Sequence, residues 1–157
     1  MEDLRTLIQN AQRNLSTADH LLYVTYPLLK DKHLIIQVAE NIFLSLENSI
    51  KAFLYYERMF KRIPNVAEGF NIQFEMFKHR YSKLENLQPE NLEYVRDLKM
   101  ILDKHKKSTV EFMRNEKFIM YSSIDDVKTL TVDQLKSYLK QTKPIVEKVK
   151  NLTLQHV

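Results

Sequence analysis

An arginine and a histidine near the start of the chain could act together on a phosphodiester. Arg13 and His20 are seven residues apart, so on one helix they lie about 10 Å apart along the axis and nearly on one face. A guanidinium binds phosphate, and an imidazole transfers protons near neutral pH. A metal-free ribonuclease needs these two groups. The alternative is that both are ordinary exposed residues, since such a pair arises by chance in many helical proteins.

Basic residues form two groups in the later part of the chain. Residues 51–157 carry twenty Lys and Arg against fourteen Asp and Glu, whereas residues 1–50 carry four against six. The first group is a candidate RNA-binding surface, because clustered cations attract phosphates; it comprises Lys104, His105, Lys106, Lys107, Arg114 and Lys117. The second group comprises Lys136, Lys140, Lys143, Lys148 and Lys150. Interspersed acidic residues leave open that both are solvated helix faces.

Several other kinds of site have no support in the sequence. The chain has no cysteine, which excludes disulfides, thiolate ligands and cysteine nucleophiles. Its five histidines are scattered, and it contains no Glu-x-x-His, HExxH or GxSxG pattern and no glycine-rich phosphate loop. We therefore predict that the protein uses no metal and no cofactor.

Length and composition indicate one ordered domain that spans residues 1–157. Of these residues 44% are apolar and sixteen are aromatic, which is enough to form a core. One glycine and four prolines are too few for a sheet-dominated fold. The apolar runs are shorter than the ~18 residues of a membrane span, and the N-terminus lacks the apolar region of a secretory signal. We expect a cytoplasmic protein with no membrane association.

Two long helices are predicted in the first half of the chain. Apolar residues recur at helical spacing from Leu4 to Leu22, and Pro27 either ends this helix near Val24 or kinks it on the way to Asp31; we favour the kinked form. Residues 33–62 contain neither Gly nor Pro and are apolar on more than one face. A helix of this kind could leave a patch uncovered in the monomer, which predicts a homodimer.

Polar residues interrupt the apolar pattern of this second helix. They are Glu40, Asn41, Glu47, Asn48 and Lys51. One interpretation makes them the solvent-exposed side of the helix, with Glu47 and Lys51 as a surface ion pair. The other makes them the polar lining of a cleft against the first helix.

Three more helices and a small hairpin are predicted in the second half. Helical spacing marks residues 70–87 and 89–106, and Thr131-Val132-Asp133-Gln134 fits a capping box that opens the last helix. Between them, residues 110–112 and 117–121 have β-branched and aromatic content in runs too short for a helix, and residues 117–121 and 127–130 make a plausible small hairpin. The expected fold is all-α, an up-and-down bundle of about five helices with a small β-hairpin before the last helix.

Two segments of the long helices resemble a known family. Ala-Asp-His-Leu-Leu at residues 18–22 and Ser-Leu-Glu-Asn-Ser-Ile-Lys-Ala-Phe-Leu at residues 45–54 are similar to stretches of the HEPN superfamily of small helical bundles. The similarity spans roughly residues 10–107. The chain also looks like an archaeal branch of this superfamily, with residues 105–131 as that branch's own addition.

The resemblance implies a dimeric all-α domain. Active members cleave RNA without metal, using an Arg, four to six intervening residues and a His. Inactive members bind RNA or proteins, often beside a nucleotidyltransferase. Arg13 and His20 match this spacing, but the family usually carries the motif on a later helix, where Arg96 and His105 have eight residues between them. The resemblance therefore favours a noncatalytic dimerisation and binding module, with RNA or a protein as partner; the alternative is a metal-independent endoribonuclease.

Overall fold

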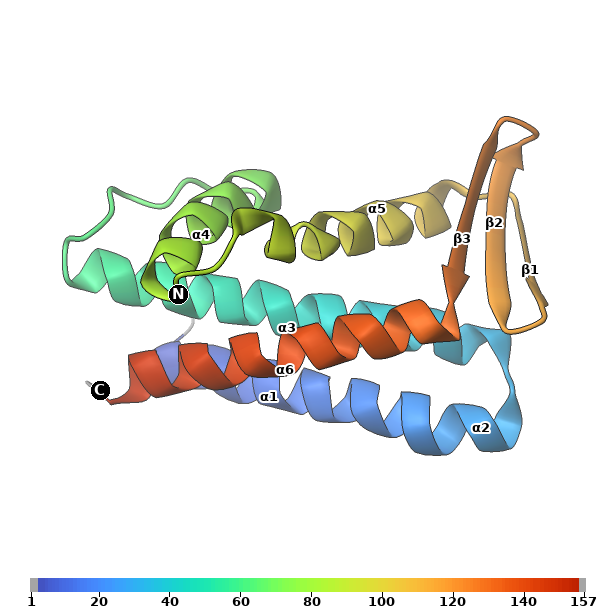
Figure 1. Ribbon diagram of the computed structural model, residues 1–157, viewed down its shortest axis with the longest axis horizontal. Helices are drawn as coiled ribbons and strands as arrows, with labels where there is room; N and C mark the ends of the chain where they lie inside the picture. The colour runs from blue at the N-terminus through green and yellow to red at the C-terminus, as the bar shows by residue number, and fades with distance from the viewer. Residues whose placement is uncertain (1–2, 156–157) are drawn as a thin grey trace.

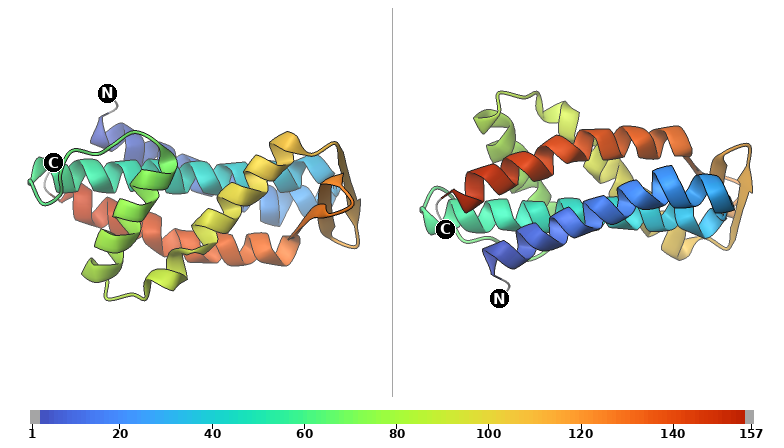
Figure 2. Two further views of the ribbon diagram at one scale, coloured as in Figure 1. Left: turned by 90° about the horizontal axis from the view of Figure 1, so that it is seen from above. Right: turned by 90° about the horizontal axis from the view of Figure 1, so that it is seen from below.

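The computed structural model describes residues 3–155, and its central element is the long helix α3 (Lys32–Met59). Helices α1 (Leu4–His20) and α6 (Val132–Leu154) pack along α3 and against each other (Figure 1). The shorter helices α4 (Phe70–Leu84) and α5 (Tyr94–Lys107) cross the remaining face of α3 at an angle (Figure 2). The predicted helical bundle is thus confirmed, with α3 at its core.

The first helix continues past Pro27, as in the kinked form that we favoured from the sequence. A π-helical segment, η1 (Leu21–Thr25), follows α1 and leads into the short helix α2 (Tyr26–Leu29). Pro27 has no N–H to donate, and the wider π spacing, in which the Tyr26 N–H donates to the Leu21 carbonyl, accommodates it. The segment ends at Lys30, whose φ is 52°.

Helix α3 is covered within the single chain, which is contrary to our expectation of an uncovered patch. Among the described residues, Leu44 and Met59 are its exposed large hydrophobic side chains. Its contact with α1 is close, because small residues line it and the buried Ser45 Oγ donates to the Ala11 carbonyl at 2.7 Å. The burial of α3 therefore gives no argument for a dimer.

The polar stripe of α3 lies on its surface. Glu47 and Lys51 are partly exposed and form the expected i, i+4 ion pair, with 3.6 Å between Lys51 Nζ and Glu47 Oε1. Asn41 Nδ2 donates to the Gln37 carbonyl of the preceding turn at 2.8 Å. These local contacts support the surface interpretation, and the interpretation as a cleft lining is wrong.

The predicted hairpin is part of a three-stranded antiparallel sheet. Strands β1 (Val110–Arg114), β2 (Lys117–Ser123) and β3 (Asp126–Thr131) follow one another in space as in sequence. The predicted hairpin did not include β1, although residues 110–112 have strand-like content, because the turn after β1, Asn115-Glu116, places a glutamate at φ 65° where a glycine or asparagine is usual. Its ion pair with Lys30 at 3.1 Å holds this turn against the end of α2.

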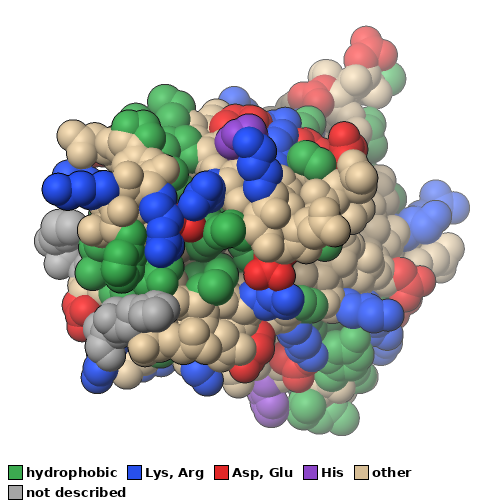
Figure 3. Space-filling model, turned by 60° about the vertical axis from the view of Figure 1, so that its left-hand side comes forward, with side chains coloured by type: hydrophobic (Ala, Val, Ile, Leu, Met, Phe, Trp, Pro, Cys, Tyr) green, Lys and Arg blue, Asp and Glu red, His purple; other side chains and the backbone are tan. Residues whose placement is uncertain are grey.

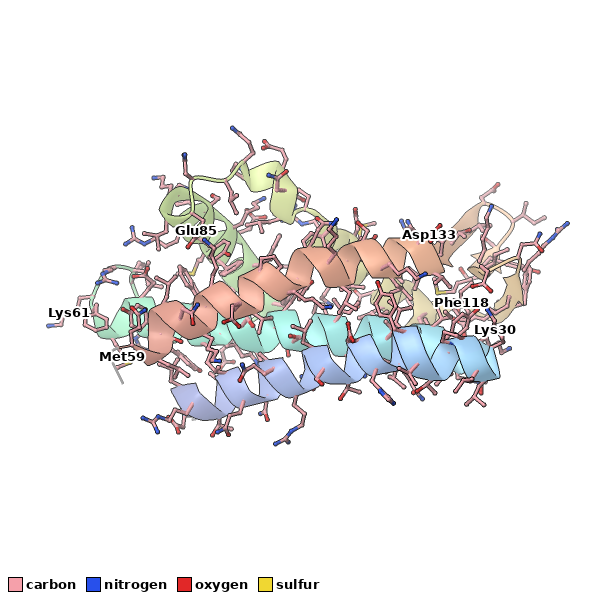
Figure 4. All side chains as sticks on the ribbon, turned by 60° about the horizontal axis from the view of Figure 1, so that its bottom comes forward. Lys30, Met59, Lys61, Glu85, Phe118 and Asp133 are labelled. Atoms are coloured by element: carbon pink, nitrogen blue, oxygen red, sulfur yellow. The ribbon has the colours of Figure 1, made fainter. Side chains whose placement is uncertain are left out.

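The sheet closes one end of the bundle and leads directly into the last helix. Figure 4 places Lys30 and Phe118 together at this end, and Met59 and Lys61 at the opposite one. The predicted capping box is confirmed, since Thr131 Oγ1 accepts from the Gln134 N–H at 3.0 Å while Gln134 Oε1 accepts from the Thr131 N–H. Thr131 is thus both the last residue of β3 and the N-cap of α6, so the strand leads into the helix without a loop.

Candidate nucleic-acid interface

The sheet has one buried and one open face. Phe118, Met120 and Leu130 are at most 2% exposed and pack into the core, so the residues that alternate with them point away from the bundle. We call this open side the outer sheet face. It consists of Val110, Phe112, Arg114, Lys117, Ile119, Tyr121, Val127, Thr129 and Thr131.

Two aromatic side chains lie at the middle of the outer sheet face. Phe112 is 38% exposed, and its ring centroid is 6.2 Å from that of Tyr121, with the two rings nearly perpendicular. They occupy diagonal positions, because Phe112 pairs with Ile119 and Tyr121 with Val110. An open aromatic surface of this kind can stack a flat heterocycle such as a nucleobase.

Two cations lie on the same face, at the end of β1 next to Phe112. Arg114 and Lys117 are opposite each other across β1 and β2, and both are exposed. Neither makes an ion pair or a side-chain hydrogen bond within residues 3–155, so both charges are available to a ligand. They border a surface hollow of about 640 Å³, which is lined by Arg114, Asn115, Lys117, Ile119, Thr129, Thr131 and Gln134.

Two further members of the predicted RNA-binding group already have acidic partners. Lys104 forms an ion pair with Asp126, and its Nζ also donates to Ser122 Oγ at 3.1 Å. The hydrogen bond from Lys104 holds the pKa of Asp126 below its usual value. His105 Nδ1 lies 2.6 Å from Glu111 Oε2, which is also the acceptor for Ser108 Oγ. Lys104 and His105 therefore join α5 to the sheet, and they offer less positive charge to a ligand than Arg114 and Lys117 do.

The structure divides the predicted group between two ends of the sheet. Lys106 and Lys107 are exposed at the end of α5, which leads into the start of β1. Arg114 and Lys117 lie at the far end of β1, about 15 Å away for a five-residue strand. At the end of the molecule opposite the sheet, cations are mixed with acidic groups (Figure 3).

Arg13 and His20 are both exposed on α1 and lie on the helix as their spacing predicted. Within residues 3–155 neither side chain has a hydrogen-bond or ion-pair partner. A histidine that acts as a base is usually oriented by a third group through its second ring nitrogen. No such group lies against His20 in the described part of the chain. In the alternative pair, Arg96 forms ion pairs with Glu75 and Glu93, and His105 with Glu111.

Sequence reasoning missed the aromatic part of this interface. Phe112 and Tyr121 lie on strands whose side chains alternate in direction, and the pairing places both on the same face as Arg114 and Lys117. The alternate positions Val110, Phe112 and Arg114 place an aromatic ring and a cation on one face, but this follows only when residues 110–114 are known to form a strand.

Comparison with protein-family models, curated proteins and solved structures finds no match for this chain. Within residues 3–155 there is no group of three or more His, Asp or Glu side chains placed to hold a metal ion. None of the helices in that part of the chain combines the length and hydropathy of a membrane span.

Proposed function

We propose that this protein is a noncatalytic RNA-binding module of HEPN type, and that single-stranded RNA binds on its outer sheet face. The observation that carries the proposal is the placement of two aromatic rings, Phe112 and Tyr121, on the same open surface as Arg114 and Lys117, which have no ion-pair partner within residues 3–155. Stacking on aromatic rings and contact with phosphates are the two interactions that single-stranded RNA offers together.

Several features favour a single strand over a duplex. Bases inside a duplex are stacked on one another, so their faces are not available to Phe112 and Tyr121. The hydroxyls of Thr129 and Thr131, beside the cations, can bond to sugar or phosphate oxygens. Val110, Ile119 and Val127 surround the rings with apolar surface, on which the rim of a base can rest.

The noncatalytic part of the proposal rests on His20, whose ring has no orienting partner in the described part of the chain. The HEPN assignment and the homodimer rest on the resemblance of residues 18–22 and 45–54 alone. If RNA is cleaved in the presence of EDTA and the His20→Ala variant loses this activity, the endoribonuclease alternative replaces the noncatalytic one.

The test is a fluorescence anisotropy titration of labelled oligouridine at low salt. We expect weak binding that depends little on sequence, because no base-edge contacts are proposed. Phe112→Ala should weaken it by roughly 5- to 100-fold, which corresponds to about 1–3 kcal/mol for one stacked base. A duplex of equal length should bind more weakly than the single strand.

Ile72→Ala is the matched control, since Ile72 is an exposed apolar residue on α4 that is 52% accessible. It should leave the affinity unchanged. Loss of affinity only with Arg114→Ala, with no effect of Phe112→Ala, would show phosphate contact without stacking and would contradict the proposed mode. Absence of RNA binding at low salt would leave a protein as the partner of this face.

A further inference from the structure

The end of the first long helix carries an exposed apolar strip. Its members are Tyr23 and Val24 in η1 and Leu28 and Leu29 in α2, with exposed fractions of 50, 47, 79 and 67%. Val24 and Leu28 are four residues apart and therefore neighbours along the helix. A single exposed leucine is ordinary, but four apolar side chains in one segment indicate an interaction surface.

A groove lies between Tyr23, the first residue of this apolar strip, and the first turns of α6. Its volume is about 430 Å³, and its lining consists of Tyr23, Lys136, Ser137, Leu139, Lys140 and Lys143. Lys136 Nζ lies 5.7 Å from the centroid of the Tyr23 ring, across the groove. Figure 4 shows α6 running beside the chain that leads into α2. The groove is therefore bordered by the ring of Tyr23 on one side and by α6 on the other.

The helical side of the groove is positively charged. Lys136, Lys140 and Lys143 follow the spacing i, i+4, i+7, so they form a row along one face of α6. Lys143 has one acidic neighbour, Asp19, at 2.8 Å. Lys140 makes no ion pair within residues 3–155. Carboxylates of a ligand would therefore find at least one uncompensated cation here.

We propose that this groove binds an acidic amphipathic helix of a partner protein. A helix lying along α6 would place apolar side chains at i and i+4 against Val24 and Leu28. Its Asp or Glu residues at i, i+4 and i+7 would face the lysine row. The complementary charge and the matching periodicity select this occupant. A bilayer surface would contact the protruding leucines but could not enter the concave groove.

The test uses a fluorescein-labelled helical peptide with leucines on one face and glutamates along its edges. The second probe is the same peptide with lysines in place of the glutamates. The glutamate peptide should bind with a dissociation constant on the order of 10 µM, more weakly at high salt, and the lysine peptide at least ~10-fold more weakly. Leu28→Asp and the pair Lys136→Glu with Lys140→Glu should each reduce the affinity at least ~10-fold.

Lys83→Glu with Leu84→Asp is the matched control, because these residues lie at the exposed end of α4. It should change the affinity less than ~2-fold. Phe112→Ala should also leave peptide binding intact, so this proposal can fail or hold independently of RNA binding on the outer sheet face. No peptide binding, or equal binding of both peptides, would overturn it. So would a dimer that Leu28→Asp dissociates, or flotation with anionic vesicles that Leu28→Asp abolishes.

Discussion

Glu57 is the most deeply buried charged side chain in the described residues, at 1% exposure. Arg62 Nη1 lies 3.3 Å from its carboxylate and Arg80 Nε 3.4 Å, so two cations from α4 and the loop before it compensate one buried anion. Arg62 also lies over the rings of Tyr56 and Phe60. This small network joins the end of α3 to α4.

Removal of Arg62 and Arg80 alone should destabilise the protein more than removal of both arginines together with the Glu57 carboxylate. Arg62→Ala with Arg80→Ala leaves the Glu57 carboxylate buried without a partner, which should cost about 3 kcal/mol or more. Adding Glu57→Leu should restore part of this loss. Urea denaturation of the variants measures both effects, and Arg58→Ala, at an exposed position of α3, is the control. If Glu57→Leu made the double variant less stable still, the compensation described here would be wrong.

The cations of the outer sheet face should differ from Lys104 in their effect on RNA binding. Arg114 and Lys117 have no partners in residues 3–155, whereas Lys104 is paired with Asp126. Each of Arg114→Ala and Lys117→Ala should therefore reduce the slope of log affinity against log salt by about 0.7. Lys104→Ala should change this slope much less. Equal slopes for all three variants would contradict the assignment of the phosphate contacts to the outer sheet face.

At the scale of elements, α4 and α5 cover the core with tyrosines whose pKa values are raised. Burial, with a smaller contribution from the charge of Glu85, raises the pKa of Tyr81 to about 12. Burial also raises the pKa of Tyr94, whose hydroxyl lies 2.9 Å from Thr142 Oγ1. The rings of Tyr81 and Phe77, both on α4, stack at 4.8 Å, and Phe53 of α3 packs edge-on against each of them.

Stability should therefore fall as the pH rises from about 10 towards 12. In the unfolded chain Tyr81 loses its proton near pH 10, whereas the folded protein retains it to about pH 12, so deprotonation favours unfolding in this interval. The contribution of Tyr81 lost by pH 11 is on the order of 1 kcal/mol. Urea unfolding at pH 9 and pH 11 should show a smaller decline for Tyr81→Phe. Tyr23→Phe, which removes an exposed phenol, should decline as the native protein does.

Helices were predictable from the sequence because their signals are local. The spacing of Leu4 to Leu22, the break at Asp31 and the capping box at Thr131 each depend on residues within one or two turns. The sheet was only partly predictable, since β1 ends in a turn with Glu116 at positive φ, held by Lys30 from a distant element. The candidate site depended on that strand, so its aromatic residues could not be identified from sequence.

At the scale of the whole molecule, one chain already covers its central helix. Helices α1, α4, α5 and α6 surround α3, so a homodimer does not follow from unsatisfied burial. The resemblance to HEPN proteins still predicts one. The sheet and the apolar strip lie at the same end of the bundle, which leaves the opposite end and the sides for contact between copies (Figure 1).

Light scattering at tens of micromolar protein tests the dimer. The expected mass is twice the 18.8 kDa of one chain, and Leu28→Asp should not change it, because the apolar strip is assigned to a partner helix. A mass of one chain would contradict the dimeric HEPN-type assembly while leaving the RNA-binding surface untouched.

The central claim is that single-stranded RNA binds on the outer sheet face. Backbone amide NMR spectra recorded during a titration with oligouridine test it most directly, since they report the site of contact residue by residue. The largest shifts should fall on residues 110–131, with Phe112, Arg114, Lys117 and Tyr121 among them, and Phe112→Ala should need a correspondingly higher RNA concentration to reach them. Shifts centred on Arg13 and His20, or none at saturating RNA, would contradict the account.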